Sequence, residues 1–258
     1  MKTLRAFVTA AALTALSSPA GAVDHVNLEE GLPVEVTDAY PLAYLGREVQ
    51  GRLQYRLTGE GEHQARFEPR FEFGLPYNGQ VSVRVPLVLG FGLPQQDAEF
   101  NLGRVALDYL YNFNQETLSL PALSLVVGVE APDTRTGGSF DPFGRVLLTK
   151  MLPGSTLWHR VHLNGAIQIN VGRESGERPW RYTVAAGYDV RLGATVVGVV
   201  DVVRDQSMRE GMVSTFGELG LRIQVTPLLA VALGGGGGAT DDGEPVARGT
   251  FGFQWFAF

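Results

Sequence analysis

Apolar and polar residues alternate along most of this chain. In residues 47–58, apolar side chains such as Leu53 and Tyr55 occupy one parity, and charged side chains such as Arg52 and Arg56 occupy the other. A β-strand points successive side chains to opposite faces, so this period of two predicts strands with one apolar and one polar face. Helical periodicity is scarce, and the chain is therefore predicted to be all-β.

Twelve alternating segments predict an antiparallel up-and-down transmembrane β-barrel. Segments such as 102–113 and 122–131 match the roughly 9–11 residues that a tilted membrane strand needs. Strands of a soluble sandwich alternate too, but they are usually only about five or six residues long. The twelve segments are centred near residues 53, 69, 85, 107, 125, 147, 163, 185, 199, 220, 231 and 251.

Aromatic residues and connection lengths support the barrel. The aromatic residues that gather near predicted strand ends, as in the girdle at a membrane interface, are Tyr109, Tyr111, Phe113, Trp180, Tyr182, Phe251, Phe253 and Trp255. Short turns alternate with longer polar connections, which predicts periplasmic turns, external loops and both termini in the periplasm. The expected turns are 74–79, 114–117, 153–155, 192–193 and 226–227, the expected loops are 90–99, 132–142, 172–179, 205–212 and 236–246, and the short connection 59–62 is an exception.

Residues 1–22 have the pattern of a secretory signal peptide. Lys2 and Arg5 precede the uncharged run 6–16, and small residues follow up to Ala22, after which cleavage is predicted. The run is too short for a membrane-spanning helix, which needs about 20 residues. The protein is therefore predicted to be exported to the cell outer membrane. Outer-membrane lipids would surround it there, and its aromatic last strand is typical of barrels inserted by the barrel assembly machinery.

Composition excludes several classes of function. The whole chain has 21 basic and 27 acidic residues, and loss of Lys2 and Arg5 with the leader leaves a formal charge of −8. An acidic balance argues against nucleic acid as a partner. Cysteine is absent, which excludes disulfides and thiolate metal sites.

Charged residues of the first four predicted strands share the polar parity. An Arg that faced lipid at mid-depth would cost about 2–4 kcal/mol, so these residues are predicted to face the lumen. There they either line a wet channel or lock together as a charge lattice that fills a closed barrel. The candidates are Glu48, Arg52, Arg56, Arg66, Glu68, Arg70, Glu72, Arg84, Arg104 and Asp108.

The histidines and a glycine run suggest no chemistry. His159 and His162 have opposite parity, so they cannot bind one metal ion together. His162 and Asn164 share a face and could orient a serine, but the surrounding sequence of outer-membrane phospholipases is absent, so they are predicted to be a lumen-facing polar pair. The run Gly234–Gly238 lacks the Lys-Ser or Lys-Thr of a phosphate loop and is predicted to be the flexible rim of a strand. No catalytic residue, metal or cofactor is predicted.

Residues 23–46 precede the predicted barrel, which occupies 47–258, as a separate N-terminal arm. One hypothesis is that part of this arm folds into the lumen and narrows the pore by pairing with arginines of the wall. The other is a loose periplasmic tail. The arm has no lysine or arginine, and its acidic residues are Asp24, Glu29, Glu30, Glu35 and Asp38.

Short motifs recur at predicted strand boundaries: Thr37-Asp38-Ala39-Tyr40-Pro41-Leu42, Phe73-Gly74-Leu75, Leu148-Thr149-Lys150, His162-Leu163-Asn164, Glu218-Leu219-Gly220-Leu221 and Gly249-Thr250-Phe251-Gly252-Phe253. In these motifs the chain from about Glu29 to Phe258 resembles the meta-pathway phenol degradation family of Gram-negative outer-membrane transporter-like β-barrel proteins. The resemblance implies a barrel that passes small molecules, including aromatic ones. The motifs belong to a barrel rather than to a catalytic site, so they bear on fold and location more than on chemistry.

The predicted function is that of a porin-like channel through which small-molecule solutes diffuse passively across the outer membrane. The alternative is a non-conducting barrel that is structural or modifies lipids. Conductance across a planar bilayer distinguishes the two, because the alternative is silent there.

Overall fold

The computed structural model describes residues 27–57, 63–91, 99–132, 139–154, 158–173 and 175–257. The predicted leader, Asp24, the turn 59–62 and Phe258 lie outside these residues. Within the described part of the chain there are fourteen strands in one antiparallel sheet. No helix among the described residues is long and apolar enough to cross a membrane.

Most strands that are consecutive along the chain pair with each other in the sheet. Their bounds are β1 Arg47–Leu57, β2 His63–Leu75, β3 Gly79–Arg84, β4 Leu87–Phe91, β5 Glu99–Leu102, β6 Ala106–Asn114, β7 Ala122–Glu130, β8 Asp141–Met151, β9 His159–Ile169, β10 Trp180–Arg191, β11 Val196–Gln206, β12 Val213–Thr226, β13 Leu229–Thr240 and β14 Pro245–Ala257.

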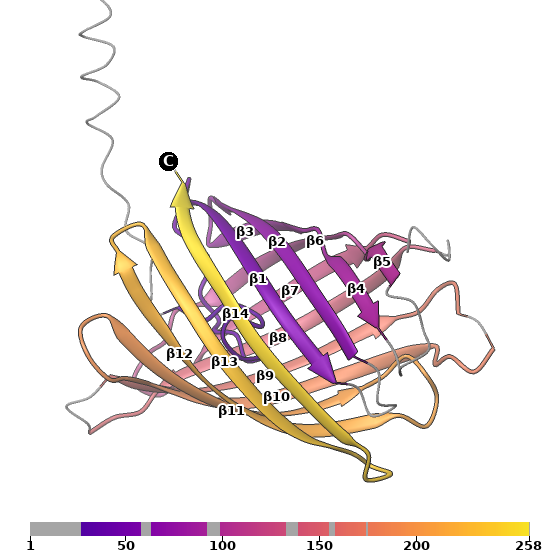
Figure 1. The fold of residues 1–258 in the computed structure, drawn as a ribbon. Helices are drawn as coiled ribbons and strands as arrows, with labels where there is room; N and C mark the ends of the chain where they lie inside the picture. Colours follow the sequence, from indigo (N-terminus) through magenta and orange to yellow (C-terminus); the bar gives the residue numbers. More distant parts are fainter. Residues whose placement is uncertain are drawn as a thin grey trace, which may run out of the picture.

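The sheet closes on itself because β1 pairs with β14 on one side and with β2 on the other (Figure 1). The first part of β2 pairs with β4 and its last part pairs with β3, so β3 and β4 are two halves of one barrel strand. The break falls at Pro86, which lacks the N–H that a ladder needs. Strands β5 and β6 are likewise two halves, paired with β4 and β3. The fourteen strands thus fill twelve positions around the described barrel, which confirms the predicted fold.

The two ends of the barrel differ in what they carry. Arg47 of β1 is opposite Ala257 of β14, so the chain enters and leaves the barrel at one end, which we call the terminal rim. The opposite end is the distal rim. Two predicted connections were wrong. The expected loop 236–246 is only the turn 241–244, because β13 continues to Thr240, and the expected turn 114–117 is the longer connection 115–121.

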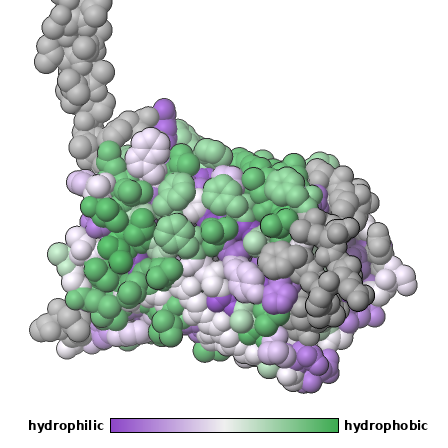
Figure 2. Space-filling model, viewed as in Figure 1, coloured by the Kyte–Doolittle hydropathy of each residue, from purple (hydrophilic) through white to green (hydrophobic). Residues whose placement is uncertain are grey.

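The outer face of the barrel is apolar and the inner face is polar. On β12, Leu219 is 67% exposed, whereas the neighbouring Glu218 is 4% exposed. Strand β1 repeats this contrast, with Leu53 49% and Gln54 7% exposed. Figure 2 shows hydrophobic side chains over much of the outer wall in this view, and hydrophilic ones at the end that carries the β13–β14 connection. The period-two pattern therefore places charge inside and hydrocarbon outside.

Candidate functional site in the lumen

The arm that precedes β1 lies inside the barrel from Leu28 to Leu42 (Figure 1). It has no regular structure over most of this length, so its backbone groups need partners other than a strand ladder. Inward-facing side chains supply them. Val36 donates its N–H to Asp201 of β11 at 2.9 Å, and Asn164 of β9 exchanges two hydrogen bonds with the backbone of Thr37 at 2.7 and 2.9 Å.

Further side chains bind other backbone groups of the arm. They are Glu218 of β12 at Glu35 N, Thr149 of β8 at Ala39 N, Asn112 of β6 and Ser124 of β7 at the Ala39 carbonyl, and Gln80 of β3 at Leu42 N. The strands that contribute these side chains are β3, β6, β7, β8, β9, β11 and β12, and they lie around most of the barrel wall. The wall is therefore built to hold this segment in one position.

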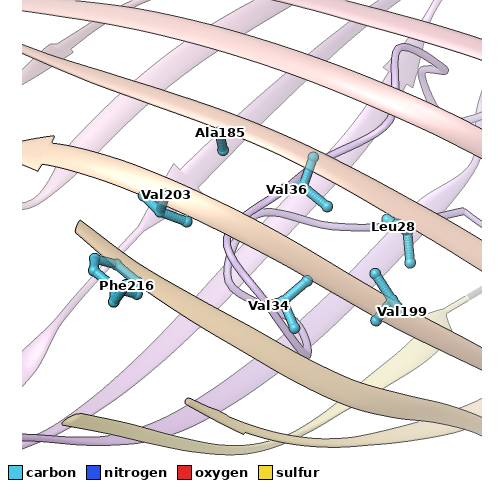
Figure 3. Packing of buried hydrophobic residues seen from close by; sticks show 7 residues of the cluster. All are labelled: Leu28, Val34, Val36, Ala185, Val199, Val203 and Phe216. Atoms are coloured by element: carbon cyan, nitrogen blue, oxygen red, sulfur yellow. The ribbon is translucent and has the colours of Figure 1, made fainter. Parts of the chain in front are cut away.

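An apolar cluster fixes the middle of the arm (Figure 3). Val34 and Val36 are buried against Val199 and Val203 of β11 and against Phe216 of β12. Strand β11 carries valines on both faces, because its inner face packs against the arm while its outer face is apolar like the rest of the wall. Burial of one valine side chain contributes about 1.5–3 kcal/mol.

Glycines let the arm approach the wall closely. Gly234 of β13 faces the arm at Pro33, and a Cβ on Gly234 would come within 2.4 Å of the Pro33 carbonyl oxygen. The run Gly234–Gly238 lies within β13 and pairs with both β12 and β14. The prediction that this run is a flexible strand rim was therefore wrong. Its inward glycines are needed because the arm and β12 occupy the space that side chains would fill.

A buried ionic network ties Asp38 of the arm to the wall. Arg160 of β9 lies 3.2 Å from an Asp38 oxygen and 2.6 Å from Asp189 of β10. His162 contacts Asp189 at 3.5 Å, and its Nδ1 lies 3.0 Å from the Thr149 hydroxyl. Thr149, His162 and Asp189 have the residue types of a hydrolase triad. However, the Thr149 hydroxyl is fully buried and accepts the Ala39 N–H, so no substrate can reach it.

Glu30 of the arm is surrounded by arginines. One of its carboxylate oxygens lies 2.7 Å from Arg145 of β8, 3.4 Å from Arg84 of β3 and 3.8 Å from Arg70 of β2. Arg52 of β1 donates to its backbone carbonyl at 3.2 Å. Burial acts to raise the pKa of Glu30, but the surrounding guanidinium groups outweigh it and hold that pKa well below its usual range.

Two further carboxylates of the arm, Glu35 and Glu29, contact charged residues of the wall. Glu35 binds Arg248 of β14 at 2.7 Å. Glu29 lies with Glu48 and Glu72 so that one oxygen of each is within 4.8 Å of the others. Burial, followed by the charge of Glu72, raises the pKa of Glu29 well above its usual value.

Three cavities follow one another past the arm. The distal cavity encloses about 1100 Å³ including solvent open to it, and the cavity at the terminal rim about 790 Å³. A much smaller cavity, with room for about one water molecule, lies between them. Glu30 and Arg145 line both the distal and the middle cavity, and Tyr40 lines both the middle and the terminal one. Successive cavities are therefore adjacent, with the narrow one beside Glu30.

The predicted site residues divide among these features. Those that line the distal cavity are Arg52, Arg56, Arg66, Arg84 and Asn164. Those at the middle cavity are Arg70 and Asp108. Glu68 is buried and pairs with Arg52 and Arg66, Glu48 and Glu72 belong to the carboxylate grouping, and His162 belongs to the Arg160 network. Arg104 lies in the break between β5 and β6, where it pairs with Asp141 at 2.5 Å.

Sequence reasoning missed most inward charges of the later strands. The same parity rule that selected the first four strands, when continued along the chain, selects them too. They are Arg145, Arg160, Asp189, Asp201, Glu218, Arg222 and Arg248.

Comparisons with known proteins establish the fold. No protein-family model matches the chain, and no curated protein matches it in sequence. Among solved structures it is similar to an outer membrane channel from Pseudomonas putida F1, with a TM-score of 0.65 and 11% identity over 85% of this chain and 98% of that one. It is also similar to the NanC porin, with a TM-score of 0.56 and 9% identity over 81% of this chain and 100% of that one. The KdgM porin gives a TM-score of 0.54 and 10% identity over 82% of this chain and 99% of that one. At these identities the likeness shows a shared barrel fold.

Replacement of Gly234 by alanine tests the close packing of arm and wall. We expect Gly234→Ala to lower the free energy of unfolding by about 1–3 kcal/mol, because the new methyl group overlaps the Pro33 carbonyl. Gly249→Ala on β14 is the matched control, since nothing lies within 4 Å of its Cβ position, and it should be neutral or stabilise by up to about 1 kcal/mol. Urea unfolding in detergent measures both. Equal effects of the two substitutions would contradict the packing described.

Proposed function

We propose that this protein is an outer-membrane channel through which small solutes diffuse passively. The observation that carries the proposal is the series of adjacent cavities that runs from the distal rim to the terminal rim inside the barrel. The middle cavity beside the arm is the constriction of the path. Its polar lining includes Arg70, Asp108 and Arg145 from the wall and Glu30 from the arm.

The distribution of side chains supports a lipid environment. A protein in water buries apolar residues and exposes charge, whereas this wall exposes leucines and encloses arginines. An apolar outer band around a polar interior is what a transmembrane barrel requires. The similar solved structures include proteins described as an outer membrane channel and as porins.

The arm acts in this proposal as a plug that narrows the pore without filling it. Its contacts with side chains from many strands make it a fixed part of the barrel interior rather than a loose tail. The predicted lumen residues of the first four strands, together with Asn164, then line the path or hold the plug.

Export and substrate range remain expectations from the sequence. Residues 1–22 would direct the chain through the inner membrane, and the barrel assembly machinery would insert it with both termini in the periplasm. Passage of aromatic molecules follows from the resemblance to the meta-pathway phenol degradation family. The competing function, a non-conducting or lipid-modifying barrel, has less support, because the Thr149, His162 and Asp189 grouping is sealed beneath the arm.

Charge on the outer wall tests the lipid environment. Leu219 and Val225 both face outward on β12, but Leu219 is in the middle of the strand and Val225 is near its end. Leu219→Arg should destabilise the protein folded in lipid vesicles by about 2–4 kcal/mol, and Val225→Arg should destabilise it by about 0–1 kcal/mol. Guanidine titrations in vesicles measure this difference. A lack of dependence on depth would argue against a membrane-spanning wall.

Single-channel recording tests transport and the plug together. The purified protein should conduct in a planar bilayer, and deletion of Asp24–Asp38 should increase the conductance, because it removes most of the segment that separates the two larger cavities. Slower migration on a denaturing gel after boiling confirms that each sample is a closed barrel. Silence of both proteins refutes the channel. Unchanged conductance of a correctly folded deletion refutes the plug.

A further inference from the structure

Three arginines from three strands converge on one carboxylate oxygen inside the lumen. The oxygen belongs to Glu30, and the nearest nitrogens of Arg145, Arg84 and Arg70 lie 2.7, 3.4 and 3.8 Å from it. The three cations are on the wall, whereas the carboxylate is on the arm. A site for one carboxylate is therefore built by the barrel and filled by a segment that is not part of it.

The three arginines differ in their other partners. Arg70 and Arg84 also lie 4.0 and 3.6 Å from oxygens of Asp108. Among the described residues, Glu30 supplies the one carboxylate within ion-pairing distance of Arg145. If Glu30 lost its charge, Arg145 would be the arginine left without a described anionic partner. A buried guanidinium in that condition is costly, and it would take up an anion from solution.

The wall holds this site in a defined shape. The guanidinium groups of Arg84 and Arg145 lie over the ring of Phe143, at 5.4 and 5.8 Å from its centroid. Stacking on an aromatic ring orients a planar cation that binds carboxylates through paired N–H groups. Glu30 and Arg145 both line the distal cavity and the constriction. The site therefore lies on the proposed path of the solute.

We propose that the site formed by Arg70, Arg84 and Arg145 binds the carboxylate of a small organic anion in transit, and that Glu30 is the internal carboxylate that such an anion replaces. The inference rests on the proposed channel function and names its class of solute. Exchange of one carboxylate for another leaves each guanidinium paired, and the displaced Glu30 carboxylate turns toward the solvent of the distal cavity, which it also lines. No charge is then buried without a partner or water. A neutral or cationic solute cannot make this exchange, so the constriction favours organic anions.

The substitution Glu30→Gln exposes the site for measurement. Isothermal titration of the folded protein in detergent uses acetate and benzoate as carboxylate probes and benzyl alcohol as a neutral ring of similar size. Glu30→Gln should bind both carboxylates at least about tenfold more tightly than the original protein, because the competing charge is gone. Affinity for benzyl alcohol should not change. Addition of Arg145→Gln to Glu30→Gln should abolish the gain.

A second arm carboxylate provides the matched control. Glu35→Gln also removes one charge from the arm, but its partner Arg248 keeps a second carboxylate, Glu218. This variant should therefore show no gain in carboxylate affinity. An equal gain in Glu35→Gln, a gain for benzyl alcohol, or no gain in a Glu30→Gln protein that retains its heat-dependent gel shift would each overturn the proposal.

Failure of this inference is distinguishable from failure of the channel. Carboxylate binding with the expected pattern in a protein that is silent in bilayers would support the anion site and refute transport. Conductance without any gain in Glu30→Gln would leave transport standing and refute the anion site.

Discussion

The pairing of charges inside the barrel is the interaction on which the rest of the structure depends. Arginines on alternate positions of the strands cannot face lipid, so they are enclosed, and once enclosed they need carboxylates within a few ångströms. The wall supplies part of this set, as with Arg52 and Glu68 at 2.6 Å. The arm supplies the rest through Glu30, Glu35 and Asp38. Because the arm has no lysine or arginine, it complements the wall rather than adding to its positive charge.

The arm also explains departures from simple alternation. An interior that held only water would favour polar residues at every inward position, yet β11 places Val199 and Val203 there, and β13 places glycine there. The valines bury apolar residues of the arm, and Gly234 leaves room for its backbone at Pro33, whereas Gly236 and Gly238 lie close to β12. The inner wall is thus polar beside the charged residues of the arm, apolar beside Val34 and Val36, and without a side chain beside Pro33. The small middle cavity lies on one side of the arm, against β2, β3, β6, β7 and β8.

The barrel could be predicted because a period of two is a local signal. Eleven of the twelve predicted centres fall within described strands, and the centre at residue 85 falls in the break between β3 and β4. Local pattern does not show where a broken strand resumes, so the division at Pro86 was not expected. The partners of the arm were beyond sequence reasoning for a different reason. Thr37 meets Asn164 across 127 residues, and no short-range pattern specifies that contact. Arg145 could have been placed inside by parity, but its meeting with Glu30 depends on how the arm folds.

The central claim is a wet, charge-paired lumen within a lipid-facing wall, and the absence of cysteine from the chain allows a direct measurement. Thr183 lines the distal cavity, and its neighbour Val184 on β10 faces outward and is 43% exposed. Single replacements Thr183→Cys and Val184→Cys, reconstituted in vesicles, can be treated with a charged water-soluble thiol reagent and with a lipid-soluble maleimide. Reaction of Thr183→Cys with the first reagent and of Val184→Cys with the second alone is the result expected. Equal reaction of both positions with the charged reagent would contradict the account.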